Sequence, residues 1–91
     1  EPNNTDSLNY KGTAMLQVGL QDKALTVFEK VIQIDPTNVV AWTTKGYILY
    51  KQGNIDGSIK AYNTALSIDP YNADANRGRN EAIRIIWPHY R

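Results

Sequence analysis

The feature that most constrains this chain is an internal repeat with a period of 34 residues. The segment Ile34-Asp35-Pro36-Thr37-Asn38 returns as Ile68-Asp69-Pro70-Tyr71-Asn72. When residues 5–38 are laid over residues 39–72, eight of the 34 positions are identical, among them Gly12 and Gly19. Periods of roughly 20 to 50 residues are typical of stacked arrays, in which each unit buries its apolar face against its neighbours.

The apolar side chains of each unit recur three, four or seven positions apart, which is the spacing of an amphipathic helix. In the second unit they are Ala41, Trp42, Ile48 and Leu49, then Ile55, Ile59, Tyr62 and Leu66. Gly53-Asn54 interrupts the pattern as a turn, so each unit is predicted to hold two helices of about 13 residues. Asp-Pro ends the second helix, because proline lacks an amide hydrogen and disfavours helix in the residue before it. Asn38 and Asn72 are placed to cap the following helix through a side-chain oxygen.

The glycine, aromatic and proline positions then identify a family. The second unit reads Trp42-x2-Lys45-Gly46-x2-Leu49, Ser58-x3-Tyr62 and Pro70; the first reads Leu8-x2-Lys11-Gly12-x2-Met15, Ala24-x3-Phe28 and Pro36. This spacing resembles the tetratricopeptide repeat, whose pattern runs Trp-x2-Leu-Gly-x2-Tyr, Ala-x3-Phe and Pro. Lys11 and Lys45 depart from it, since the family usually has leucine there. The resemblance implies an all-α, right-handed superhelical array of helix-turn-helix units.

We therefore expect residues 1–91 to form one domain. Residues 5–38 and 39–72 would be the two repeats, and residues 73–91 a capping helix and tail. Residues 1–4, Glu1-Pro2-Asn3-Asn4, have the form of Asp35-Pro36-Thr37-Asn38 and are expected to be the closing turn of a preceding repeat. The segment would then come from a longer array; alternatively, the turn only caps the helix from Thr5.

The last unit keeps small or apolar residues on one face and becomes polar on another. Asn76 and Asn80 stand at the positions of Trp42 and Gly46, as expected of a solvating cap. Ile83, Ile86 and Trp87 are expected to cover the second repeat before Pro88 ends the helix. The alternative is that this Ile-Ile-Trp run stays exposed and contacts a partner.

The residues for chemistry are few. There is no cysteine, which excludes disulfides, thiolate metal sites and cysteine nucleophiles. His89 follows a helix-breaking proline and is expected to be a surface residue, while Asp35 and Asp69 are explained by their helix-ending role. We expect no catalytic residue, no cofactor and no metal ion, and therefore no enzyme. A cytoplasmic location without membrane insertion is expected, because neither a signal peptide nor a membrane-spanning run is found.

The expected function is protein binding in the concave groove that the first helix of each repeat lines. The partner would be a peptide or helix of another protein. The candidate groove residues are Asn9, Thr13, Gln17, Thr43, Tyr47, Tyr50, Lys51, Arg77, Glu81 and Arg84. Tyr47 and Tyr50 matter most, since tyrosine is enriched at binding hot spots.

Chaperone-associated members of the family hold a C-terminal carboxylate with lysine, asparagine and arginine side chains on this face. The corresponding positions here carry Asn9, Thr13, Thr44, Asp74 and Gly78. None of these supplies a cation, and Asp74 supplies the opposite charge. A carboxylate clamp is therefore not expected.

Two other functions stay open. The first is self-association, with the open first helix and the Ile-Ile-Trp tail stacking copies into a homo-oligomer. The second is RNA binding through Arg77, Arg79, Arg84 and Arg91, which are offset by Asp74 and Glu81. The net charge of +1 provides no strong field, so no nucleic acid is expected as a partner.

Overall fold

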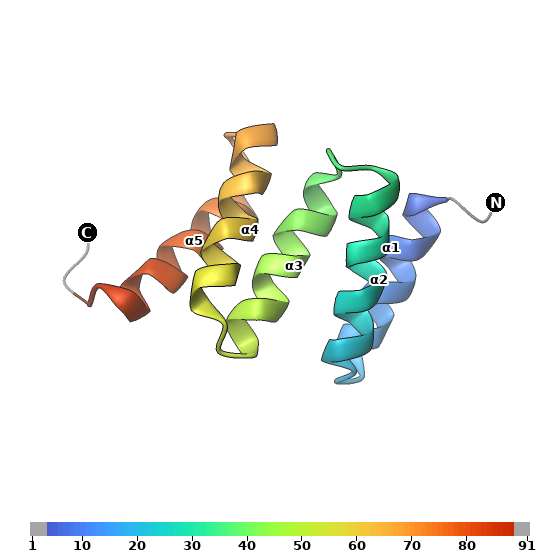
Figure 1. Cartoon of the computed structure of the whole chain (residues 1–91), viewed down its shortest axis with the longest axis horizontal. Helices are drawn as coiled ribbons and strands as arrows, with labels where there is room; N and C mark the ends of the chain where they lie inside the picture. Colours follow the sequence, from blue (N-terminus) through green and yellow to red (C-terminus); the bar gives the residue numbers. More distant parts are fainter. Residues whose placement is uncertain (1–3, 89–91) are drawn as a thin grey trace.

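The structure is a computed structural model that describes residues 4–88, and these residues form helices joined by short turns. The helices are α1 (Thr5–Gln17), α2 (Gln21–Ile34), α3 (Val39–Lys51), α4 (Ile55–Ile68) and α5 (Ala73–Ile86). They follow one another along the long axis of the molecule (Figure 1). The start points of α1, α3 and α5 are 34 residues apart, which is the period of the sequence. The all-α helical repeat predicted from the sequence is confirmed.

Side-chain caps and turns set the helix boundaries as predicted. The Oδ1 atoms of Asn38 and Asn72 accept hydrogen bonds from the amides of Ala41 and Ala75, at 3.0 and 2.9 Å. Gly53 has a φ of 87° in the turn between α3 and α4, a left-handed conformation that glycine adopts without a steric cost. These local signals confine each helix to its predicted segment.

The two aspartates that precede prolines have a structural role in the turns. Asp35 Oδ1 accepts hydrogen bonds from the amide and the hydroxyl of Thr37, at 3.3 and 3.0 Å. Asp69 Oδ1 accepts one from the amide of Tyr71 at 3.3 Å. Each carboxylate therefore stabilises the turn that leads into the next helix, as the helix-ending interpretation predicted.

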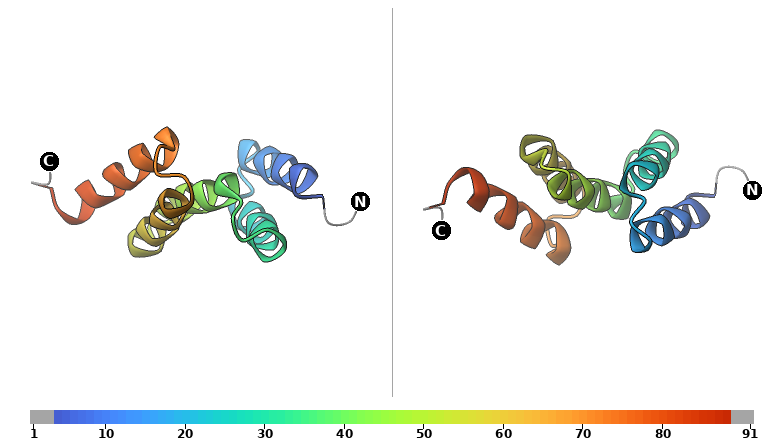
Figure 2. Two further views of the ribbon diagram at one scale, coloured as in Figure 1. Left: turned by 90° about the horizontal axis from the view of Figure 1, so that it is seen from above. Right: turned by 90° about the horizontal axis from the view of Figure 1, so that it is seen from below.

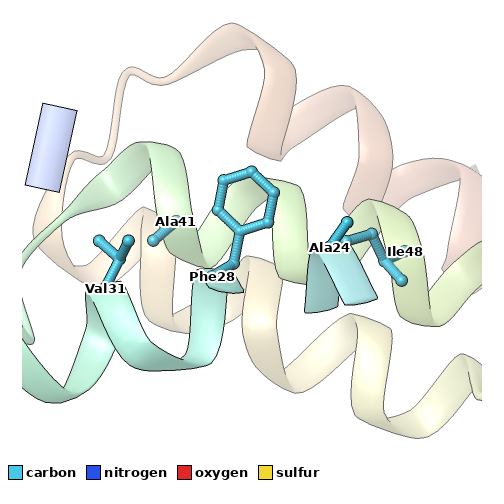
Figure 3. Packing of buried hydrophobic residues seen from close by; sticks show 5 residues of the cluster. All are labelled: Ala24, Phe28, Val31, Ala41 and Ile48. Atoms are coloured by element: carbon cyan, nitrogen blue, oxygen red, sulfur yellow. The ribbon is translucent and has the colours of Figure 1, made fainter. Parts of the chain in front are cut away.

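One part of the core joins the two repeats. Ala24, Phe28 and Val31 of α2 pack against Ala41 and Ile48 of α3, and all five are fully buried (Figure 3). Figure 3 shows the side chains of the two helices meeting. Because this core joins α2 of the first repeat to α3 of the second, the repeats form one continuous array.

A second part of the core joins α4 to α5. Tyr62, Ala65 and Leu66 of α4 pack with Ala75 of α5, and Ala82 is also fully buried. Asn76 Nδ2 donates to the carbonyl of Pro70 at 3.4 Å, where in the preceding repeat Trp42 Nε1 donates to Pro36 at 2.8 Å. The asparagine thus makes the hydrogen bond that the tryptophan makes in the preceding repeat.

The expected covering of the second repeat by Ile86 and Trp87 is wrong. Their exposed fractions are 43% and 62%, and only Ile83 is half-buried. The C-terminal end of α5 runs away from α4 in Figures 1 and 2, so the last turn extends beyond the helix that could bury it. The exposed Ile-Ile-Trp run is the alternative that the sequence left open.

Two further expectations concern residues outside the described range. The closing turn of a preceding repeat falls mainly on residues 1–3, and His89 and Arg91 lie beyond residue 88. Between residues 4 and 88, no helix is both long and apolar enough to cross a membrane.

Candidate functional site

Helices α1 and α5 lie on one side of the molecule and α2 and α4 on the other, with α3 between them (Figure 2). This arrangement follows from the pairing of helices within each repeat and from the contact of α5 with α3. The first helices of successive units therefore present a common face, on which most of the candidate groove residues were predicted.

A cleft of about 340 Å³ opens on this face between α3 and α5. Its lining residues are Thr43, Thr44, Tyr47, Tyr50, Lys51, Tyr62, Asp74, Arg77, Gly78 and Glu81. Ligand pockets in proteins span roughly 300 to 1,000 Å³, so the cleft has the size to hold one or two side chains of a peptide.

Tyr62 lines the cleft although it lies on α4, the second helix of its repeat. Its ring packs against Gly46 of α3, where a Cβ atom would come within 2.9 Å of the ring. A Cβ at Gly78 of α5 would overlap the same ring. Two glycines on opposite helices thus let the tyrosine reach between them, and it is only 3% exposed.

The crossing of α3 and α4 is fixed by a buried hydrogen bond beside this ring. Ser58 Oγ donates to the carbonyl oxygen of Gly46 at 2.7 Å, and Ser58 is fully buried. A buried hydroxyl is costly unless it is hydrogen-bonded, and this bond provides its partner. The small residues Gly46 and Ser58 therefore let α3 and α4 approach closely where the Tyr62 ring packs.

Burial raises the pKa of the Tyr62 hydroxyl to about 12, with the negative charge of Glu81 as the next cause. The phenol is therefore neutral at physiological pH. Two further tyrosines, Tyr47 and Tyr50, line the cleft with it.

The charges of the cleft are two cations and two carboxylates. Arg77 Nη1 lies 3.5 Å from Asp74 Oδ1, one turn apart on α5, with both side chains exposed. Lys51 Nζ lies 5.6 Å from the centre of the Tyr47 ring, a cation–π distance. Glu81 has no ion-pair partner among residues 4–88. Thr43 Oγ1 is buried and has no hydrogen-bond partner within the same range.

Six of the ten predicted groove residues line the cleft. They are Thr43, Tyr47, Tyr50, Lys51, Arg77 and Glu81. The other four, Asn9, Thr13 and Gln17 on α1 and Arg84 near the end of α5, lie outside it. The structure thus concentrates the candidate site at the second repeat and α5.

Tyr62 is the cleft residue that sequence reasoning missed. It was assigned to the helix pairing of the second repeat, and a buried aromatic at this position does pack there. A signal was present in Gly78, since a glycine inside a helix often marks the close approach of another group.

No cluster of three histidine, cysteine, aspartate or glutamate side chains that could hold a metal ion is found in residues 4–88. Arg79 Nη2 donates to Asn76 Oδ1 at 3.4 Å, so it is engaged on its own helix. A depression on the opposite face contains Lys45, which lies 3.5 Å from Glu29 and 5.4 Å from the centre of the Trp42 ring.

Comparison with protein families covers nearly the whole described chain. Two models described as "Tetratricopeptide repeat" match residues 6–38 and 27–60, and one described as "TPR repeat" matches residues 46–83. The chain belongs to the tetratricopeptide repeat family. The matched segments of this TPR chain include both 34-residue units and most of α5.

Curated relatives of the TPR chain are much longer proteins. It is 26% identical over 77 residues to the small glutamine-rich tetratricopeptide repeat-containing protein 2 of Mycosarcoma maydis, covering 85% of this chain and 22% of that protein. It is 35% identical over 72 residues to tetratricopeptide repeat protein 37 of Xenopus laevis, covering 77% of this chain and 5% of that protein. The chain thus spans about a fifth or less of these relatives.

Solved TPR structures share the fold. The first TPR of Spaghetti (RPAP3) bound to the HSP90 peptide SRMEEVD superposes with a TM-score of 0.89 at 14% identity, covering 94% of this chain and 68% of that one. The Sgt2 TPR domain from Aspergillus fumigatus gives a TM-score of 0.87 at 23% identity, covering 93% and 58%. At these identities the likeness establishes the helical repeat architecture.

Proposed function

We propose that this TPR chain is a non-catalytic protein-interaction module that binds a peptide or helix of a partner protein along the face of α1, α3 and α5. The observation that carries the proposal is the cleft between α3 and α5, lined by Tyr47, Tyr50 and Tyr62. Tyrosines supply a large contact area at a low entropic cost, which suits a recognition surface. The peptide-bound Spaghetti domain, which has the same fold, supports the proposal by analogy.

The proposed contact residues are those of the sequence prediction. Six of them line the cleft, while Asn9, Thr13 and Gln17 would extend the surface along α1 and Arg84 along α5. Tyr47 is 46% exposed and is therefore available to a partner without any change in the core.

The test uses a photo-crosslinking amino acid at position 47 in the intact protein, in cells that express it. A matched control places the same group at Tyr71, which is 92% exposed in the turn before α5 and lies outside the cleft. We expect adducts with another protein at position 47, and their loss when Lys51→Glu is added. Adducts that form only at position 71, or survive Lys51→Glu unchanged, would show that the cleft is not the binding surface.

Self-association is a second candidate, favoured by the exposed run Ile85, Ile86 and Trp87 at the end of α5. Apolar side chains grouped in this way mark interaction sites more often than isolated ones do. The occupant would be a second copy of the chain, docked on α1, where Tyr10 and the C-cap residue Val18 are also exposed. Sedimentation equilibrium at two concentrations should show a dimer that Trp87→Ser abolishes; a monomer at both concentrations rejects this function.

A further inference from the structure

We propose that α5 pairs with α5 of a second copy of the chain in an antiparallel, two-fold symmetric contact. The inference goes beyond the proposed function, because the contact surface differs from the docking of the end of α5 on α1. It rests on the order, the spacing and the exposure of the charges along α5.

Four charged side chains form one stripe along α5. They are three, four and three residues apart, a spacing that places side chains on the same side of a helix. In chain order the stripe reads negative, positive, negative, positive: Asp74, Arg77, Glu81 and Arg84. Ala75 and Ala82 are fully buried on another side of α5, so the stripe is turned away from the core.

The stripe is accessible to another molecule. The side chains of Asp74 and Arg77 are 78% and 69% exposed, and Glu81 and Arg84 are exposed as well. Asp74 and Arg77 form an ion pair with each other, whereas Glu81 and Arg84 form none in residues 4–88, although they are one turn apart. The stripe therefore keeps an anion and a cation that a contact outside the chain can pair.

The stripe is complementary to itself when it is reversed. Asp74 and Arg84 stand five residues on either side of Arg79. Arg77 and Glu81 stand two residues on either side of it. A two-fold axis at the level of Arg79 therefore pairs Asp74 with the second copy's Arg84. The same axis pairs Arg77 with the second copy's Glu81, and each pair occurs twice.

The axis also brings apolar side chains together at both ends of the stripe. Ile85, which is 53% exposed, and Ala73, also exposed, stand six residues on either side of Arg79. Ile85 therefore lies opposite the second copy's Ala73, and Tyr71, two residues before Ala73, is 92% exposed. Exposed ion pairs contribute little individually, so apolar burial at the two ends adds stability, while the charges fix the antiparallel orientation.

This contact would compete with the proposed partner. Asp74, Arg77 and Glu81 also line the cleft between α3 and α5. A second copy on the stripe would cover the α5 side of the cleft, so self-association and partner binding would exclude each other. The chain would then present its cleft when it is dilute or when a partner displaces the second copy.

The test measures self-association of the full chain by sedimentation equilibrium at two concentrations and at low salt. We expect a monomer–dimer equilibrium that weakens as salt is added, because exposed charges are screened. Arg77→Glu should raise the dissociation constant of the dimer by about tenfold, since two attractive pairs become repulsive. Adding Glu81→Arg to this variant should restore association, because the exchanged charges make the stripe complementary to itself again.

Lys30→Glu is the matched control, because it makes the same charge reversal at an exposed position of α2. It should leave the dimer unchanged. Circular dichroism checks that each variant stays folded, and Arg84→Glu tests the outer pair if Arg77→Glu loses helix.

Three results would overturn the pairing and leave the proposed partner binding standing. They are a monomer at both concentrations, a dimer that Arg77→Glu and Arg84→Glu leave as strong as before, and a loss of association that the exchange of charges at positions 77 and 81 does not restore. A dimer that Trp87→Ser abolishes but Arg77→Glu does not weaken would place the contact between α1 and the end of α5 instead.

Discussion

At the scale of single residues, the site depends on Gly46 and Gly78, whose lack of a side chain leaves space between the helices. Both glycines lie against the ring of Tyr62, which reaches the cleft through the space that they leave. Glycine inside a helix costs about 0.5 to 1 kcal/mol relative to alanine. Glycine is nevertheless found at these two positions, because a Cβ there would collide with the Tyr62 ring.

The first prediction tests this crossing. Gly46→Ala would place a Cβ within 2.9 Å of the Tyr62 ring, so overpacking should lower the free energy of unfolding by about 1 to 3 kcal/mol despite the better helix propensity. Urea denaturation followed by circular dichroism measures the change. Gly57→Ala, whose Cβ would first meet the short polar side chain of Asn54 rather than a buried ring, should cost less. A stabilised Gly46→Ala protein would contradict the packing account.

The second prediction concerns the titration of Tyr62, whose folded-state pKa of about 12 lies above the ordinary tyrosine value of 10.0. A raised pKa means that the folded state holds the proton more tightly, so this group's contribution to stability is present below pH 10 and is lost as the pH rises toward 12. The free energy of unfolding should therefore fall between pH 8 and pH 11, and it should fall further in the native chain than in Tyr62→Phe. An equal fall in both proteins would show that Tyr62 is not the group responsible.

At the scale of helices, burial is unequal along the array. Gly12 is the buried residue of α1, whereas α4 buries Ser58, Ala61, Tyr62, Ala65 and Leu66. Both α1 and α3 begin with an asparagine cap; Asn4 accepts from the amide of Ser7 at 3.2 Å and Asn38 from that of Ala41 at 3.0 Å. The same capping bond thus supports a peripheral helix in one repeat and a central helix in the other.

The third prediction follows from this difference. Asn38→Ala should lower the global free energy of unfolding by about 1 kcal/mol, the usual cost of losing an N-cap. Asn4→Ala should mainly speed hydrogen exchange in α1, because that helix lies at one end of the described array and packs mainly on α2. Native-state hydrogen exchange by NMR separates the two effects. An equal loss of global stability in both variants would contradict the view that α1 is a peripheral helix and α3 a central one.

Helix boundaries were predictable because their signals are local. Asn38, Gly53 and Asp69 specify a cap, a left-handed turn and a helix end, each within a few residues of its effect. The path of α5 was not predictable in the same way. Its C-terminal turn is exposed because of where α4 ends in space, and no pattern within α5 encodes that relation.

At the scale of the whole molecule, the candidate site was only partly predictable. Residues on the first-helix face followed from the 34-residue period, and six of the ten line the cleft. Tyr62 could not be predicted from the face of the first helices, because it belongs to α4 and reaches the cleft between α3 and α5. The stretch from Asn9 to Gln17 lies outside the cleft, since the cleft is formed by the packing of α5 onto α3 and α4.

The central claim is that partner binding uses the face of α3 and α5. The most direct measurement is hydrogen exchange of the intact protein with and without the partner recovered by crosslinking. We predict added protection in residues 43–51 and 74–81, with little change in residues 55–61 of α4. Protection confined to α2 and α4, or to residues 83–87 at the end of α5, would contradict the account.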